Sequence, residues 1–279
     1  MITAQDINKL RKQTGAGIMS CKKALTEAGG DFDKAIEVLR KKGQKVFAAR
    51  AERSTTEGVV LAKTNEEANY GVMIALSCET DFVAKNEAFQ QLGKAVLDAA
   101  FTHQPTTTEA LLQLVVEGTS LQERITELVG KIGEKVTISA YTTLSSDTVG
   151  TYIHLGSKLG VLVGLKGSRG AQVTAAARDV AMQVAAMNPL AVDKDGIDAT
   201  TIDKELAIAQ EQARNEGKPE AMLDKIAQGR LHKFFKENTL LHQPFVKNNT
   251  VTIAQYLASV APNLTVADFK RTTVSPEPC

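Results

Sequence analysis

The sequence changes from a strand pattern to a helix pattern across Thr80-Asp81-Phe82-Val83-Ala84-Lys85-Asn86. The run before this stretch, residues 71–78, is strand-like, and the run after it, residues 87–100, is helix-like. Junctions of this kind often carry working residues, because loops positioned by a rigid scaffold are free to bind or react. This one holds an acid, a large aromatic and a base within five positions, so it is the first candidate for a functional site.

The residues alone leave two interpretations of this junction open. In the first, Asp81 is the N-cap of the following helix and Phe82 is a core residue. In the second, Asp81, Phe82 and Lys85 perform chemistry or grip a partner.

Upstream of the junction, the pattern predicts two strands, at residues 58–63 and 71–78. Side chains alternate along the second strand in two sets, which favours an antiparallel pair with one buried face. The sets are Val72, Ile74, Leu76 and Met73, Ala75, Ser77. Downstream we expect helices at 87–102 and 121–131 and a strand at 136–143.

A similar order of elements recurs later in the chain. Residues 150–155 and 160–166 are strand-like and are joined by a tight turn at Gly156-Ser157-Lys158. A predicted helix at 171–187 follows and ends at Asn188-Pro189. The recurrence predicts two related subdomains, each a small antiparallel sheet backed by helices.

Residues 1–42 show the pattern of three short helices. Thr3 and Asp6 have the spacing of a capping box at the start of the first helix, Gly15-Ala16-Gly17 ends it, and Asp31 caps the third. Basic residues follow, which we interpret as the solvated face of a helical linker. They are Arg40, Lys41, Lys42, Lys45, Arg50 and Arg53.

Residues 200–237 predict an inserted helical hairpin whose turn is Gly217-Lys218-Pro219. Apolar residues recur every three to five positions along both helices and predict the seam between them. They are Ile202, Leu206, Ala209 and Ala213, then Met222, Ile226, Leu231 and Phe234. Three uses of the hairpin stay open: it pairs two copies of the chain as a homodimer, it contacts another partner, or it does neither. A helix at 253–260 and a strand near 269–274 complete the chain.

These patterns predict an α+β protein with four parts. The first is an N-terminal three-helix domain with its linker, residues 1–53. The second is a core subdomain at 54–145, and the third is a core subdomain at 146–199 and 238–279. The fourth is the inserted coiled-coil hairpin, residues 200–237.

Composition narrows the class of function. The 279 residues include 33 Lys and Arg against 32 Asp and Glu, so there is no basic field of the kind that nucleic acid attracts. Trp is absent and aromatic residues make up 5% of the chain, which leaves little for stacking on bases. We therefore expect no direct contact with nucleic acid.

Other features predict a cytoplasmic protein. The three cysteines, Cys21, Cys78 and Cys279, are far apart and form no CxxC pair, which is typical of a reducing compartment. Residues 1–10 contain no apolar segment of a secretory signal. No apolar run approaches the roughly 20 residues that span a bilayer, so we expect no membrane association.

Sequence motifs of common enzyme classes are absent. There is no phosphate-binding loop, dinucleotide fingerprint, zinc-protease helix or nucleophile elbow. The four histidines show no ligand spacing, so we expect no metal site. Gly167-Ser168-Arg169-Gly170 precedes a helix and has two interpretations, an anion site or a plain loop.

Two long segments resemble a known family. Residues 14–25, Thr-Gly-Ala-Gly-Ile-Met-Ser-Cys-Lys-Lys-Ala-Leu, and residues 80–86 resemble the two signatures of bacterial elongation factor Ts. The strand Gly160-Val161-Leu162-Val163 after His154, the turn at residues 217–219 and Gln243-Pro244-Phe245-Val246 are also similar. The resemblance covers nearly the whole chain in the same order.

The resemblance implies a guanine nucleotide exchange factor for elongation factor Tu, with a ubiquitin-associated-like N-terminal domain, no cofactor and no covalent chemistry. It implies that Asp81 and Phe82 wedge beside the magnesium site of the GTPase and loosen its phosphate loop. Some members carry an extra C-terminal helix, and we expect that contact to be missing here. The implied partner-binding residues are Thr80, Asp81, Phe82, Val83 and Lys85 at the wedge, Ile18 and Met19 in the N-terminal domain, and His154 and Val246 in the later subdomain.

Three classes of function follow from these observations. The first is the exchange factor. The second is an adaptor or chaperone that binds through the N-terminal helices and the hairpin without promoting exchange. The third is an enzyme that uses Asp81 and Lys85.

Overall fold

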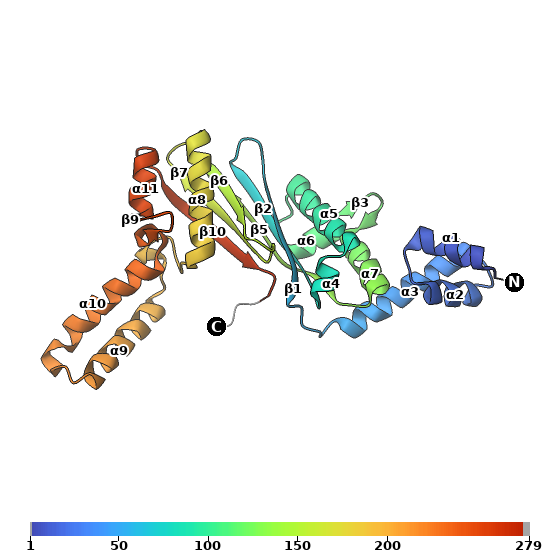
Figure 1. Ribbon diagram of the computed structural model, residues 1–279, viewed down its shortest axis with the longest axis horizontal. Helices are drawn as coiled ribbons and strands as arrows, with labels where there is room; N and C mark the ends of the chain where they lie inside the picture. Colours follow the sequence, from blue (N-terminus) through green and yellow to red (C-terminus); the bar gives the residue numbers. More distant parts are fainter. Residues whose placement is uncertain (1, 276–279) are drawn as a thin grey trace.

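The computed structural model describes residues 2–275 and confirms the α+β architecture. Figure 1 shows an elongated molecule with N-terminal helices at one end, a helical hairpin at the other and strands between them. Cys21 and Cys78 are buried free thiols, whereas Cys279 and the rest of the tail after Ser275 lie outside the described residues. Within residues 2–275, every helix is too short or too polar to cross a membrane.

Three helices form the N-terminal part, as predicted. The capping box is present, because the Thr3 hydroxyl accepts a hydrogen bond from the Asp6 backbone N–H at 3.1 Å and the Asp6 carboxylate accepts one from that of Thr3 at 2.9 Å. Gly15 ends the first helix in the left-handed conformation, with φ 68°. The helices are α1 (Ala4–Thr14), α2 (Ile18–Glu27) and α3 (Phe32–Arg50). Their small core is formed by Leu10, Ala16, Cys21, Ala24, Leu25 and Ala35.

The predicted linker is the second half of α3. One face is exposed to solvent as expected, and the other is packed against the protein. The side chains of Lys41, Lys42 and Lys45 are exposed. On the opposite face Gly43 is buried and Val46 and Phe47 pack against the core of the next part. The helix is therefore docked along one side, because it carries apolar residues at helical spacing between the basic ones.

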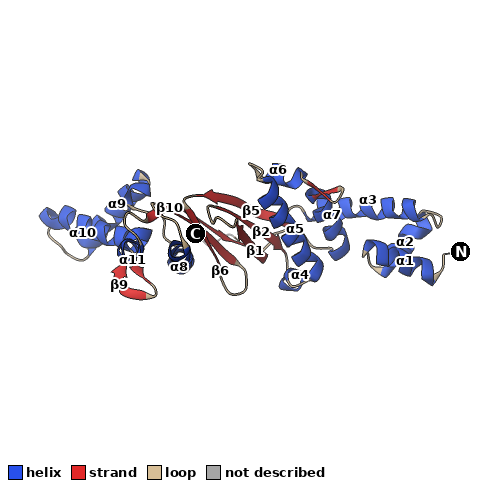
Figure 2. Ribbon diagram, turned by 90° about the horizontal axis from the view of Figure 1, so that it is seen from above, coloured by secondary structure: helices blue, strands red, loops and turns tan. Residues whose placement is uncertain are grey.

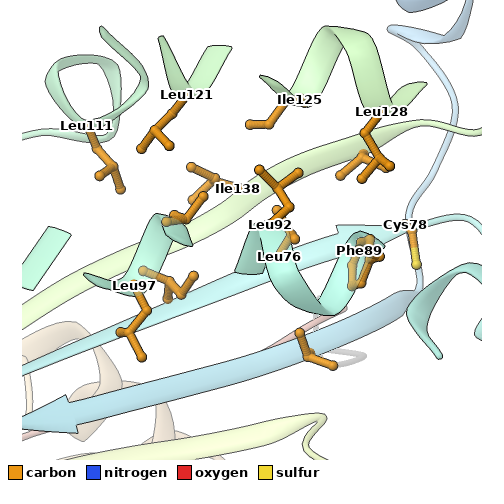
Figure 3. Close-up of a cluster of buried hydrophobic side chains, with 14 of the residues drawn as sticks. Leu76, Cys78, Phe89, Leu92, Leu97, Leu111, Leu121, Ile125, Leu128 and Ile138 are labelled. Atoms are coloured by element: carbon orange, nitrogen blue, oxygen red, sulfur yellow. The ribbon is translucent and has the colours of Figure 1, made fainter. Parts of the chain in front are cut away.

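The first sheet has three antiparallel strands in the order β1-β2-β5. The strands are β1 (Glu57–Thr64), β2 (Tyr70–Cys78) and β5 (Val136–Ser145). Helices cover one face, namely α4 (Asp81–Ala84), α5 (Glu87–His103), α6 (Thr108–Gln113) and α7 (Leu121–Ile132). A short hairpin, β3 (Val115–Val116) and β4 (Thr119–Ser120), precedes α7. Figure 3 shows the core between the helices and the sheet, in which Leu76, Phe89, Ile125 and Ile138 lie.

The second sheet repeats this plan. Its strands are β6 (Thr148–Ile153), β7 (Leu159–Lys166) and β10 (Thr265–Thr273), antiparallel in the order β10-β7-β6. In both sheets a hairpin is followed by a helix, and the last strand pairs with the second strand of the hairpin. The other elements are α8 (Ala171–Met187), β8 (Pro244–Phe245), β9 (Asn248–Thr252) and α11 (Ile253–Val260). The predicted residue boundaries between domains stay a prediction.

The prediction of one buried face on the first sheet is wrong. Strand β2 is buried on both faces from Gly71 to Cys78. The face opposite the helices packs on the second sheet, where Met73 and Ala75 meet Leu162 in a separate apolar cluster. A Cβ atom on Gly160 of that sheet would lie 2.6 Å from Val60 Cγ1 and 2.9 Å from the Met73 sulfur, so a larger residue would require these side chains to shift. Alternation within β2 does not reveal this contact, because both of its sets are largely apolar.

The hairpin is present, with α9 (Ala199–Asn215) and α10 (Glu220–Asn238) packed together. Short 3-10 turns lie on either side, at Lys194–Gly196 and Leu240–His242. Ala209, Ala213 and Leu231 are buried as predicted. The prediction is wrong for Met222, which is 48% exposed, and Leu223 and Ala227 are the other buried residues of α10. Helical spacing fits a stripe that begins at Met222 and one that begins at Leu223. The side of α10 that packs on α9 carries Leu223, Ala227 and Leu231.

We predict that Met73→Ala lowers the free energy of unfolding by about 2–5 kcal/mol, because it leaves a cavity between the two sheets. Met222→Ala is the matched control and should change it by less than about 0.5 kcal/mol, because that side chain is largely exposed. Urea unfolding followed by circular dichroism measures both. Equal losses in the two variants would show that the sheets do not share a core.

Candidate functional site

The turn that carries Phe82 is a single helical turn, α4, placed directly after β2. Thr80 is its N-cap, since the Thr80 hydroxyl accepts a hydrogen bond from the Val83 backbone N–H at 3.4 Å. The interpretation of Asp81 as the N-cap is therefore wrong, and Asp81 is the first helical residue. Asn86 then caps α5 by accepting from the Ala88 N–H at 2.9 Å.

Phe82 is not a core residue, because its side chain is 81% exposed. Its neighbours Val83 and Ala84 are 6% and 7% exposed and belong to the core of the first sheet. A helical turn that buries two successive residues must direct the preceding one outward. Val83, expected to contact a partner, is thus placed inside the protein, where it anchors the turn that presents Phe82.

Polar contacts hold the base of α4. The Thr80 backbone N–H and hydroxyl both donate to the carboxylate of Glu134, at 3.0 and 2.8 Å. The Cys78 thiol donates to the Thr80 carbonyl at 3.2 Å. Burial and the nearby carboxylates of Glu134 and Glu57 raise the pKa of this thiol to about 12, so it is protonated and unreactive.

Asp81 and Lys85 form an ion pair along α4, with 2.6 Å between the Lys85 Nζ and Asp81 Oδ2 atoms. The hydrogen bond from Lys85 lowers the pKa of Asp81, and the same bond raises the pKa of Lys85. Both groups are thus charged near neutral pH. Neither shift moves toward 7, as a general base or acid would require.

The turn between β6 and β7 lies beside this helix. The Ser157 carbonyl accepts a hydrogen bond from the Val60 N–H at 2.6 Å, and the Lys158 Nζ lies 2.6 Å from the Glu57 carboxylate. The charge of Lys158 also contributes to the lowered pKa of Asp81. The structure therefore brings the turn that carries His154 next to the turn that carries Phe82.

Leu155 is a further surface residue that the sequence patterns did not indicate. Its side chain is 94% exposed, next to His154, whose Nδ1 atom lies 3.1 Å from the Tyr152 hydroxyl. The position of Leu155 directly before Gly156 of a tight turn could have indicated this exposure, because side chains at the tip of a turn rarely reach the core. Phe82 on the one hand, and His154 and Leu155 on the other, are thus exposed on two neighbouring turns, one from each sheet.

The other predicted contact residues lie elsewhere on the molecule. Ile18 and Met19 are exposed at the start of α2, so they do not belong to the core of the N-terminal helices. Val246 is also exposed, and its backbone N–H donates to the Gln183 side chain at 2.8 Å. In Figures 1 and 2 the N-terminal helices and the β8–β9 region lie on opposite sides of the paired sheets. The candidate residues therefore form three patches along one elongated molecule.

This arrangement differs from a small-molecule site. A cavity of about 670 Å³ lies at the opposite end of β2 from Phe82. Its lining includes Tyr70, Pro105 and Tyr141 but none of the predicted site residues. Among residues 2–275, no group of three or more His, Cys, Asp or Glu side chains is placed to hold a metal ion. Separated apolar patches with exposed aromatic and aliphatic side chains are typical of a protein-binding surface.

Comparison with known proteins supports a single family. The family model described as Elongation factor TS matches residues 79–275. A protein of Amoebophilus asiaticus is 64% identical over 273 residues, which cover 98% of this chain and 99% of that protein. Proteins of Cytophaga hutchinsonii and Christiangramia forsetii are 52% and 51% identical, over 98% and 97% of this chain and 99% and 97% of their own lengths. All three are named Elongation factor Ts. The chain therefore belongs to the elongation factor Ts family of translation elongation factors.

Proposed function

We propose that this chain is a guanine nucleotide exchange factor that binds elongation factor Tu and promotes the release of GDP. The observation that carries the proposal is Phe82, a large aromatic side chain that is 81% exposed on a firmly anchored turn. Membership of the family supports the identity of the partner. Binding alone promotes the release of GDP, with no covalent step. The exchange takes place in the cytoplasm, where translation occurs.

The mechanism rests on inserting Phe82 into the GTPase beside its magnesium site. An exposed aromatic ring gains binding free energy when a partner buries it, and aromatic side chains are common at the centres of interfaces. Magnesium is held by few protein ligands together with phosphate oxygens at near-ideal octahedral geometry. A small displacement of those ligands or of the phosphate loop therefore weakens the binding of both the ion and GDP.

Exchange is then a coupling between two binding events. If this chain lowers the affinity of the GTPase for GDP by some factor, GDP must lower the affinity for this chain by the same factor. The chain returns free after nucleotide rebinds, so small amounts act repeatedly.

Anchoring of α4 makes Phe82 an effective wedge. Val83 and Ala84 pack in the core of the first sheet, and the Thr80 hydroxyl donates a hydrogen bond to Glu134. The ring therefore enters the partner without a loss of backbone freedom on binding, and little binding free energy is spent on ordering. Asp81 and Lys85, paired and exposed, supply polar contacts at the rim.

Further contacts would come from the other exposed patches. Ile18 and Met19 would bind an apolar surface of the GTPase domain, whereas His154 and Leu155 would extend the contact made by Phe82. Val246 would add a contact from the turn between β8 and β9. A homodimer through the hairpin stays a prediction, as does the absence of direct contact with nucleic acid.

We predict that Phe82→Ala reduces the acceleration of GDP release by about 30-fold, which corresponds to about 2 kcal/mol of lost coupling. Stopped-flow release of fluorescent GDP from elongation factor Tu measures it, with Val115→Ala as the control because Val115 is an exposed apolar residue on another surface. The non-exchanging adaptor would bind the GTPase, leave its GDP release rate unchanged at saturation, and be indifferent to Phe82→Ala.

The N-cap of α4 can be tested separately from Phe82. Thr80→Val removes the hydroxyl that caps α4 and binds Glu134, and we expect it to cost about 1 kcal/mol of stability and to slow GDP release several-fold. Thr107→Val removes a similar cap, the hydroxyl that accepts from the Ala110 N–H at 3.1 Å, on a helix far from the site. That variant should lose comparable stability and keep full exchange. Equal exchange rates in the two variants would contradict a positioning role for Thr80.

A further inference from the structure

Helix α3 belongs to two parts of the molecule at once. Its first half contributes Phe32, Ile36 and Leu39 to the core of the N-terminal helices. Its second half packs Val46 and Phe47 against the core of the first sheet. In Figures 1 and 2 the helix runs without a break from the N-terminal helices to α7, so the two parts are joined by a continuous rod rather than by a loop.

Two glycines allow α3 and α7 to touch backbone to backbone. A Cβ atom on Gly130 of α7 would lie 2.7 Å from the Gly43 Cα atom, which is closer than real contacts allow. A Cβ atom on Gly43 would lie 3.4 Å from the Thr126 carbonyl oxygen. Any side chain at Gly130 must therefore push α3 away from α7. Close crossings of this kind fix both the separation and the angle of two helices.

A cluster of charges fixes the end of α3. Glu79 is largely buried and accepts hydrogen bonds from Arg50 at 3.3 Å and from the Lys135 backbone N–H at 2.7 Å. Arg53 lies 4.0 Å from the same carboxylate. The Lys135 Nζ donates to the carbonyls of Ala51 and Arg53, at 2.7 and 2.9 Å, and so satisfies the backbone where the helix ends.

Glu79 is also the residue before Thr80. The charge cluster around Glu79, which we call the clamp on α3, therefore adjoins the turn that carries Phe82. The α7–β5 loop contributes to both, because its Lys135 binds Glu79 and its Glu134 binds Thr80. Exposed ion pairs contribute little to stability. Glu79 contributes more, because it accepts hydrogen bonds from several donors at a largely buried position. The end of α3 and the base of α4 are thus held by one connected network.

We propose that α3 is a fixed strut which sets the distance and angle between the patch of Ile18 and Met19 and the patch of Phe82. The residues that hold it are Gly43, Gly130 and Glu79. Where the proposed function holds, the strut lets both patches engage the GTPase together, since a rigid link keeps the effective concentration of the second contact high. A loose link would leave the N-terminal helices to find their contact independently.

The geometric part is tested without a partner. Spin labels at Glu27→Cys on α2 and Lys94→Cys on α5, with Cys279→Ser, report the distance between the two parts by electron paramagnetic resonance, while Cys21 and Cys78 are too buried to react. The parent should give one narrow distribution and Gly130→Val a shifted or broadened one. Gly229→Val is the matched control, a helical glycine with open space around it, and should leave the distribution unchanged.

Glu79→Gln is the second variant, because it weakens the clamp without adding bulk at the crossing. It should also broaden the distribution, which keeps the test decisive if Gly130→Val does not fold. Unchanged distributions in the folded variants would overturn the strut.

The functional part is tested by GDP release from elongation factor Tu. Gly130→Val should raise the concentration for half-maximal acceleration about tenfold and leave the maximal rate unchanged, because Phe82 is untouched. Replacing Ile18 and Met19 by alanine in the Gly130→Val variant should raise the half-maximal concentration little further, because those contacts no longer act together with Phe82. An unchanged half-maximal concentration despite a broadened distribution would overturn the role in binding. Failure of the parent to accelerate release would refute the proposed function, while the distance measurement would still decide the strut.

Discussion

Packing of the two three-stranded sheets against each other positions the exposed turns of this protein. Met73 and Ala75 on β2 meet Leu162 on β7, and the side chains of Val60 and Met73 fill the space beside Gly160. The packing brings the β6–β7 turn beside the start of β1, where Lys158 pairs with Glu57. The turn that carries Phe82 and the turn that carries His154 and Leu155 are neighbours because these two sheets share a core.

The exposure of Phe82 is a consequence of how α4 is held. A single helical turn is too short to be stable alone, and it persists here because Val83 and Ala84 enter the core and Glu134 binds Thr80. The same loop that supplies Glu134 supplies Lys135 to the end of α3. The positions of Phe82 and of the N-terminal helices therefore both depend on residues of the α7–β5 loop.

Local signals predicted most elements well. The helices at 171–187 and 253–260 begin and end as expected, because apolar spacing agrees with the residues at their ends. The capping box at Thr3 and the Gly217-Lys218-Pro219 turn are similarly local. Errors arose where two interpretations had equal local support. Met222 and Leu223 both fit a helical stripe, and Thr80 and Asp81 are both good N-caps. The structure adds α6, β3 and β4 between residues 105 and 121, where the sequence patterns predict no element.

The fold class, the order of elements, the repeated sheet plan and, from the two signature segments, the family can all be predicted from the amino-acid sequence. These depend on spacing, caps and turn residues, which act over a few positions along the chain. Three features become visible only in the folded chain: β2 is covered on both faces, Val83 is buried while Phe82 is exposed, and α3 packs on α7 through Gly43 and Gly130. Each of these depends on which surface arrives from a distant part of the chain, and an apolar residue or a glycine carries no local mark of the partner that it will meet.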